Sequence, residues 1–132
     1  MHYKIPEGTK YITQETFSYY DKKNEITNIT IPDNVTSIGD YAFLNLFELE
    51  SIEIPSSVTE IGEGAFAFCY KLKSITIPKG VTEIGDRVFY KCDKLKHPSI
   101  PETTELGIDI FGEMDSSEYM ILKSVMHECE KV

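Results

Sequence analysis

The chain has 132 residues, of which 41% are hydrophobic and none is tryptophan, as in one ordinary soluble domain. Its 22 acids and 13 bases give a net charge of -9, which argues against an electrostatic grip on nucleic acid or on an anionic membrane. No apolar run approaches the roughly 18 residues of a spanning helix, and residues 1–4 lack the apolar segment that follows the start of a secretory signal. We expect no membrane insertion and a cytoplasmic location, or a surface or secreted one if the chain is part of a longer protein.

A repeat of 23 residues runs through most of the chain. The segment LESIEIPSSVTEIGEGAFAFCYK from Leu49 aligns without a gap with the next segment, LKSITIPKGVTEIGDRVFYKCDK. Prolines recur at this interval, and an earlier one precedes them by 26 residues, which gives the series Pro6, Pro32, Pro55, Pro78 and Pro101. Five prolines predict five coils of a solenoid, in which each coil buries its apolar surface against its neighbours.

Within each coil the predicted elements follow in a fixed order. Isoleucines alternate before the proline, as in Ile52 and Ile54, and this period of two predicts a strand. A valine, an isoleucine, a glycine at which the coil turns, and an inward phenylalanine follow, as in residues 58–66. The first coil has about three extra residues between Phe17 and Ile26, and the last is one residue shorter, as end coils often are irregular.

The solenoid is predicted to cover residues 1–114, and residues 115–132 are predicted to form a C-terminal capping helix or tail. Asp115 and Glu118 have capping-box spacing ahead of an apolar stripe at helical spacing, formed by Leu122, Val125, Met126 and Cys129. We expect this helix to bury the last coil. A dimer contact through the same stripe and a degenerate sixth strand at residues 120–122 are alternatives.

The motif LxxIxI, as in Leu49, Ile52 and Ile54, resembles the BspA-like leucine-rich-repeat family, because proline and valine follow it and a phenylalanine stands late in the coil. The resemblance covers residues 3–111. It implies a right-handed leucine-rich-repeat solenoid, with a parallel β-sheet on one side and short helical or turn segments on the other. It also implies binding, and it names no ligand.

No residues point to catalysis, a metal or a cofactor, so the protein is expected not to be an enzyme. His2, His97 and His127 are far apart, and His97 is interpreted as a solvated position of the repeat. Cys69 and Cys92 recur at one coil position and are predicted to be stacked core thiols, with a disulfide between adjacent coils as the alternative. All three cysteines, Cys129 included, are expected to be free.

Two surfaces are candidates for binding a partner. The first is the outer face of the predicted sheet, a small and polar row formed by Asn28, Thr30, Ser51, Glu53, Ser74, Thr76, His97 and Ser99. The resemblance makes it the expected contact surface, although short hydroxyl side chains are also good cross-strand neighbours. The second is an aromatic side formed by Leu44, Phe47, Phe68, Tyr70 and Tyr90. Aromatic clusters favour interfaces, but these rings could equally pack over neighbouring coils.

The charges are banded along the chain. Residues 24–70 hold eight acids and no lysine or arginine, residues 71–96 hold seven bases and three acids, and residues 97–132 hold eight acids and two bases. Such banding can orient a partner or a second copy of the chain, although a solvated surface gives the same pattern.

These observations predict a non-catalytic protein–protein interaction module that uses the sheet face or the aromatic side. The alternative is a small acidic inhibitor that blocks the nucleic-acid-binding site of a basic protein with residues 25–63. Salt-sensitive affinity would favour the inhibitor, and salt-insensitive binding through aromatic side chains would favour the module. The expected partner is another protein, without nucleic acid or cofactor, and a homo-oligomer is a further expectation.

Overall fold

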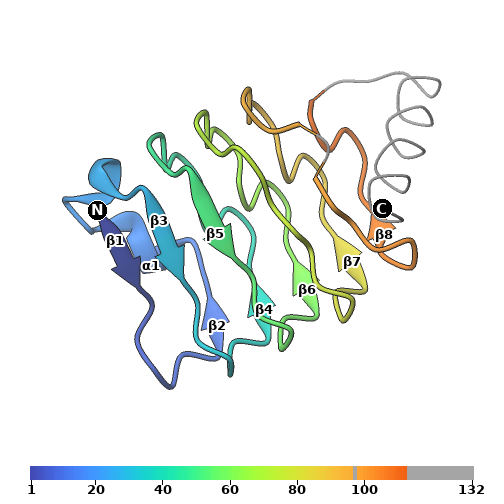
Figure 1. Cartoon of the computed structure of the whole chain (residues 1–132), viewed down its shortest axis with the longest axis horizontal. Helices are drawn as coiled ribbons and strands as arrows, with labels where there is room; N and C mark the ends of the chain where they lie inside the picture. Colours follow the sequence, from blue (N-terminus) through green and yellow to red (C-terminus); the bar gives the residue numbers. More distant parts are fainter. Residues whose placement is uncertain (97, 113–132) are drawn as a thin grey trace.

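The computed structural model describes residues 1–96 and 98–112, which form a solenoid (Figure 1). Its elements in chain order are β1 (His2–Lys4), β2 (Tyr11–Ile12), α1 (Glu15–Ser18), the 3-10 helix η1 (Lys23–Glu25), β3 (Asn28–Thr30), β4 (Ser37–Ile38), β5 (Ser51–Glu53), β6 (Glu60–Ile61), β7 (Glu83–Ile84) and β8 (Glu105–Leu106). Neither helix in this part of the chain has the length and apolar character needed to cross a bilayer. The boundary predicted after residue 114, the capping helix and the sixth strand lie outside the described residues.

Two parallel sheets form two sides of the solenoid, and neighbouring strands in each come from successive coils (Figure 1). The first sheet has the order β1-β3-β5 and the second has the order β2-β4-β6-β7-β8. On the first side, a bridge between Thr76 and Ser99 joins the described residues of the fourth and fifth coils. Pro98, which lacks the N–H of a regular strand residue, stands there at the ladder position of Ile75. The predicted parallel solenoid is confirmed, and the second sheet adds a side that the sequence did not predict.

Turns form the third side, as predicted. On this side, backbone N–H groups of one coil donate to carbonyl groups of the next: Tyr41 N–H lies 2.8 Å from Glu63 O, and Phe43 N–H lies 2.8 Å from Ala65 O. Buried backbone groups need such partners, so these bonds allow an irregular segment to stack as regularly as a strand. Both helices of the described residues belong to the first coil.

The core is a continuous column of apolar side chains along the solenoid. Phe43, Phe66 and Phe89 are completely buried, and their ring centroids are 5.1 and 6.0 Å apart. Phe17 and Phe111 extend the stack at 5.8 and 5.6 Å from its ends. One phenylalanine is buried in each of the first four coils, and Phe111 of the fifth is half-buried, which confirms the predicted repeat register.

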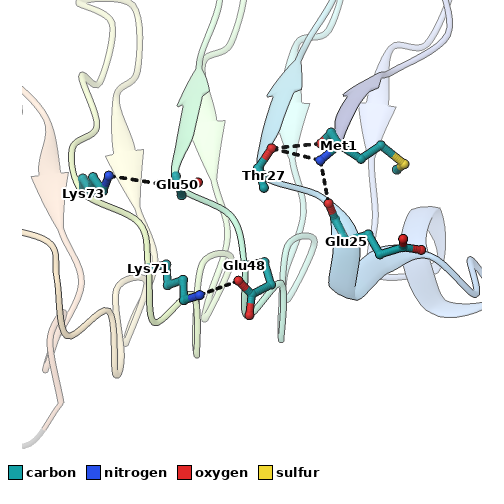
Figure 2. A network of polar contacts seen from close by, with 7 residues as sticks. All are labelled: Met1, Glu25, Thr27, Glu48, Glu50, Lys71 and Lys73. Carbon is teal, nitrogen blue, oxygen red and sulfur yellow. Dashed lines mark hydrogen bonds and ion pairs between the residues drawn. The ribbon is translucent and has the colours of Figure 1, made fainter.

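The extra residues of the first coil bring a second aromatic cluster to its end of the core. Tyr20 lies 5.2 Å from Tyr3, whose ring in turn makes an edge contact with Phe17 at 5.1 Å between centroids. The Met1 ammonium donates a hydrogen bond to the Thr27 hydroxyl at 3.1 Å, as Figure 2 shows. The extra residues that make the first coil irregular therefore help to cover its core residues.

Candidate interaction surfaces

The outward side chains of the first sheet form the small polar row that the sequence predicted. Asn28 and Thr30 of β3 are in register with Ser51 and Glu53 of β5, and all four are exposed. The exposed row continues into the fourth coil, and the fifth coil adds a half-buried residue, as seen at Ser74, Thr76 and Ser99. His97 lies outside the described residues. The repeat therefore brings seven of the eight predicted residues onto one face.

An open groove of about 760 Å³ runs over this face. Besides residues of the predicted row, its lining includes His2, Ser56 and Pro78, which were not predicted as site residues. His2 Nε2 lies 2.6 Å from the Thr30 hydroxyl. The offset of 26 residues between Pro6 and Pro32 was the signal that could have placed His2 one coil before Asn28, where the structure puts it.

Ion pairs between coils flank the groove. Lys73 lies 3.0 Å from Glu50, and Lys71 lies 2.6 Å from Glu48 (Figure 2). The hydrogen bond from Lys73 lowers the pKa of Glu50, and the bond to Glu48 raises the pKa of Lys71. Two acids of residues 25–63 are thus paired with lysines, which reduces the free negative charge that this stretch offers to a basic protein.

The predicted aromatic side is a connected row of rings. Phe47 stacks on Tyr70 at 5.6 Å, and Phe68 makes edge contacts with Tyr70 at 6.0 Å and with Tyr90 at 5.4 Å. Phe47 and Tyr70 are 37% and 38% exposed, whereas Phe68, Tyr90 and Leu44 are half-buried. The row packs against itself, as one of the two interpretations expected, and it still offers two rings to solvent, so binding through this row stays a prediction.

Phe68 has an unusual backbone for an aromatic residue. Its φ is 63°, in the left-handed region, where Asn45 stands one coil earlier with a φ of 66°. Asparagine tolerates this conformation, whereas a bulky side chain there is a genuine outlier. Lys91 repeats the conformation one coil later with a φ of 60°, so the left-handed residue belongs to the turn of the repeat.

The two cysteines of the repeat are buried free thiols, as predicted. Cys69 Sγ donates to Phe43 O at 3.3 Å, and Cys92 Sγ donates to Phe66 O at 3.1 Å. Burial raises the pKa of Cys92 to about 12 and raises that of Cys69 well above its ordinary value. Neither thiol has the low pKa and exposure of a reactive cysteine. In the described part of the chain, no three His, Cys, Asp or Glu side chains are grouped as metal ligands would be.

Known proteins share both the repeat and the fold. The sequence model of the family described as BspA type leucine rich repeat region matches residues 2–118 of this chain in six copies. A leucine rich repeat protein of T. pallidum is 26% identical to this chain, with a TM-score of 0.72. The match covers 82% of this chain and 51% of that protein. No curated protein matches the chain.

Two further solved structures are similar. A leucine rich cell surface protein of Faecalibacterium prausnitzii is 31% identical to this chain, with a TM-score of 0.69. The match covers 92% of this chain and 34% of that protein. A leucine-rich repeat protein of Bacteroides ovatus is 30% identical to this chain, with a TM-score of 0.66. The match covers 85% of this chain and 30% of that protein. This chain thus spans between 30% and 51% of the length of these three proteins. From the repeat, the stacked coils and the matched model together, the chain belongs to the BspA-type leucine-rich repeat family.

Proposed function

We propose that this chain is a non-catalytic protein–protein interaction module that holds its partner on the outer face of the first sheet. The groove of about 760 Å³ on that face carries the proposal. Membership of a leucine-rich repeat family supports a repeat module of the interaction type. Fold alone does not assign a function, so the proposal depends on the groove and the residues that line it.

The chemistry of the groove suits a polypeptide partner. Its outward residues Thr30, Ser51, Ser74 and Thr76 have short side chains with a hydroxyl group, so a partner can approach closely and exchange hydrogen bonds. Short side chains also lose little conformational entropy on binding, and strands held in register by neighbouring coils are already ordered. Glu53 supplies an acidic group within this otherwise largely neutral row.

Two pairs of substitutions test which surface binds. Ser51→Arg with Ser74→Arg fills the groove, and Phe47→Ser with Tyr70→Ser removes the two most exposed rings of the aromatic row. We expect the arginine pair to abolish capture of a partner from the source cell, with unfolding curves close to those of the unmodified protein. Loss of each contact that is central to an interface costs about 2 kcal/mol or more.

The opposite result would overturn the assignment. If the serine pair abolishes capture and the arginine pair does not, the aromatic row is the binding surface. We chose Phe47 and Tyr70 because Phe68 and Tyr90 are half-buried, so their loss would also destabilise the coils. Affinity that falls steeply with salt would instead favour the acidic inhibitor. Sedimentation of the purified chain tests self-association.

A further inference from the structure

The outer face of the second sheet carries another open groove, of about 490 Å³. One side of it is a row of glutamates in register on β6, β7 and β8, namely Glu60, Glu83 and Glu105. The other side is a row of acids that follow the turn glycines, namely Asp40, Glu63 and Asp86. Among the described residues, its lining includes these six acids and no lysine, arginine or histidine.

The glutamate row is unfavourable for the isolated chain. Adjacent strands lie about 4.8 Å apart, and like charges placed opposite one another on a sheet are destabilising. Within the described residues, no hydrogen bond or ion pair relieves the carboxylates of Glu60, Glu83 and Glu105. The edge of the first sheet differs, because there the acids of one coil face lysines of the next (Figure 2).

The opposite row is held in place by the fold. Asp40 Oδ1 accepts a hydrogen bond from Glu63 N–H at 2.8 Å, and Glu63 Oε2 accepts one from the Tyr41 hydroxyl at 2.9 Å. Between the two rows stands the glycine ladder, where a Cβ on Gly62 would lie 2.6 Å from Asp40 N. The close packing of the coils therefore requires glycine, and the absence of side chains there leaves the hollow between two acidic rows.

We propose that this acidic groove binds an extended lysine- or arginine-rich segment of another protein, a contact beyond the one proposed for the first sheet. A single metal ion does not suit it, because the described acids are not grouped as ligands. Three glutamates on adjacent strands span about 10 Å, and an extended peptide places alternate side chains about 7 Å apart. The peptide would lie along the solenoid axis, across the strands. Its basic side chains are long and flexible, so they can reach the carboxylates although the two spacings differ.

The test uses the full chain and a short fluorescein-labelled peptide in which lysine and serine alternate. Fluorescence anisotropy should show binding at low salt that weakens as salt rises. The variant with Glu60→Gln, Glu83→Gln and Glu105→Gln should bind this peptide about tenfold more weakly, as expected for losing three exposed charge contacts. It should also melt at a higher temperature, because the like charges have been removed.

A charge-matched control separates the groove from the net charge. Glu7→Gln, Glu25→Gln and Glu102→Gln remove three exposed acids that do not line the groove. The proposal requires this control to bind like the unmodified chain, and equal weakening of both triple variants would overturn it. So would a lack of binding by the unmodified chain, or unchanged binding by the groove variant.

Two additional variants guard the result. If the groove triple variant does not fold, Glu83→Gln alone, at the centre of the row, should weaken binding about threefold, and unchanged binding would overturn the proposal. Ser51→Arg with Ser74→Arg should leave peptide binding intact, since these residues lie on the first sheet. Failure of the first-sheet assignment and failure of the acidic groove are therefore separate outcomes.

Discussion

Two rows of aromatic rings run along the solenoid. Their rings are spaced nearly equally, but one row is buried and the other is partly exposed to solvent. Centroids in the buried row, which includes Phe66, are 5.1 to 6.0 Å apart, and those in the outer row are 5.4 to 6.0 Å apart. Yet Phe66 is completely buried, whereas Tyr70 is 38% exposed. Stacking of the coils sets the distances between rings of neighbouring coils, whereas Phe68 and Tyr70 belong to one coil. Burial decides whether a ring chiefly stabilises the fold or can also contact a partner.

The largest expected effect falls on the buried row. Phe66→Ala should lower the free energy of unfolding by about 3–5 kcal/mol, because it removes a ring that contacts rings in both neighbouring coils and leaves a cavity. Urea unfolding followed by circular dichroism measures this loss. A variant that keeps its stability and only loses a partner would contradict the register of the core.

The buried thiols provide a second test of the inner side. Burial raises the pKa of Cys92 from an ordinary 9.0 to about 12, so its contribution to stability is present below pH 9 and is lost as the pH rises towards 12. Unfolding free energies measured at increasing pH above 9 should therefore fall, and Cys92→Ala should reduce the fall.

Reactivity checks the same burial directly. In a Cys129→Ser background, Cys69 and Cys92 should not react with Ellman's reagent at pH 8 until the chain is unfolded. Rapid reaction of either thiol in the folded protein would show that the inner column opens or is wrongly placed.

The inner row could be predicted from the sequence because its requirements repeat. In the three central coils, the positions of Phe66 and Ile52 hold a buried phenylalanine and a buried isoleucine, so the spacing predicts their burial. The second sheet was missed for a physical reason. Its strands are only two residues long, as in Glu60–Ile61, and so short a strand shows no alternation of polar and apolar residues.

The surfaces were predictable only in part. The small residues of the first-sheet face follow from strand alternation, so Ser51 and Ser74 could be assigned in advance. The acidic groove could not, because Glu60 and Glu83 become neighbours only once the short strands pair. The exposure of Tyr70 relative to Phe68 depends on the turn, in which Phe68 takes a left-handed backbone that no spacing rule indicates.

The outer row should respond less to substitution than the buried row. Phe47→Ser and Tyr70→Ser should each cost about 1 kcal/mol, since each ring has already more than a third of its surface in water. Thermal unfolding of the two variants beside Phe66→Ala gives the ranking. Losses as large as that of Phe66→Ala would mean that the outer row is core, and it would then be a poor candidate for binding.

The smallest effect is expected at the ion pair between Lys73 and Glu50, whose side chains are 69% and 44% exposed. Lys73→Gln should lower the stability only slightly at neutral pH, because water screens exposed pairs and ordering two long side chains opposes them. Lys79→Gln, which removes an exposed lysine that makes no ion pair within the described residues, is the matched control.

The pH dependence identifies this pair as the source of that difference. Lys73 lowers the pKa of Glu50 below its ordinary 4.5, so the stabilisation is present above pH 4.5 and is lost as the pH falls through the lowered value. The stability difference between Lys73→Gln and the unmodified chain should therefore vanish in acid, and NMR titration should show the Glu50 pKa rising in Lys73→Gln but not in Lys79→Gln. A stability difference that persists after Glu50 is protonated would have to come from packing of the lysine stem. The edge of the first sheet would then not be stabilised by its ion pair, and it would not differ in this respect from the unpaired glutamates of the second sheet.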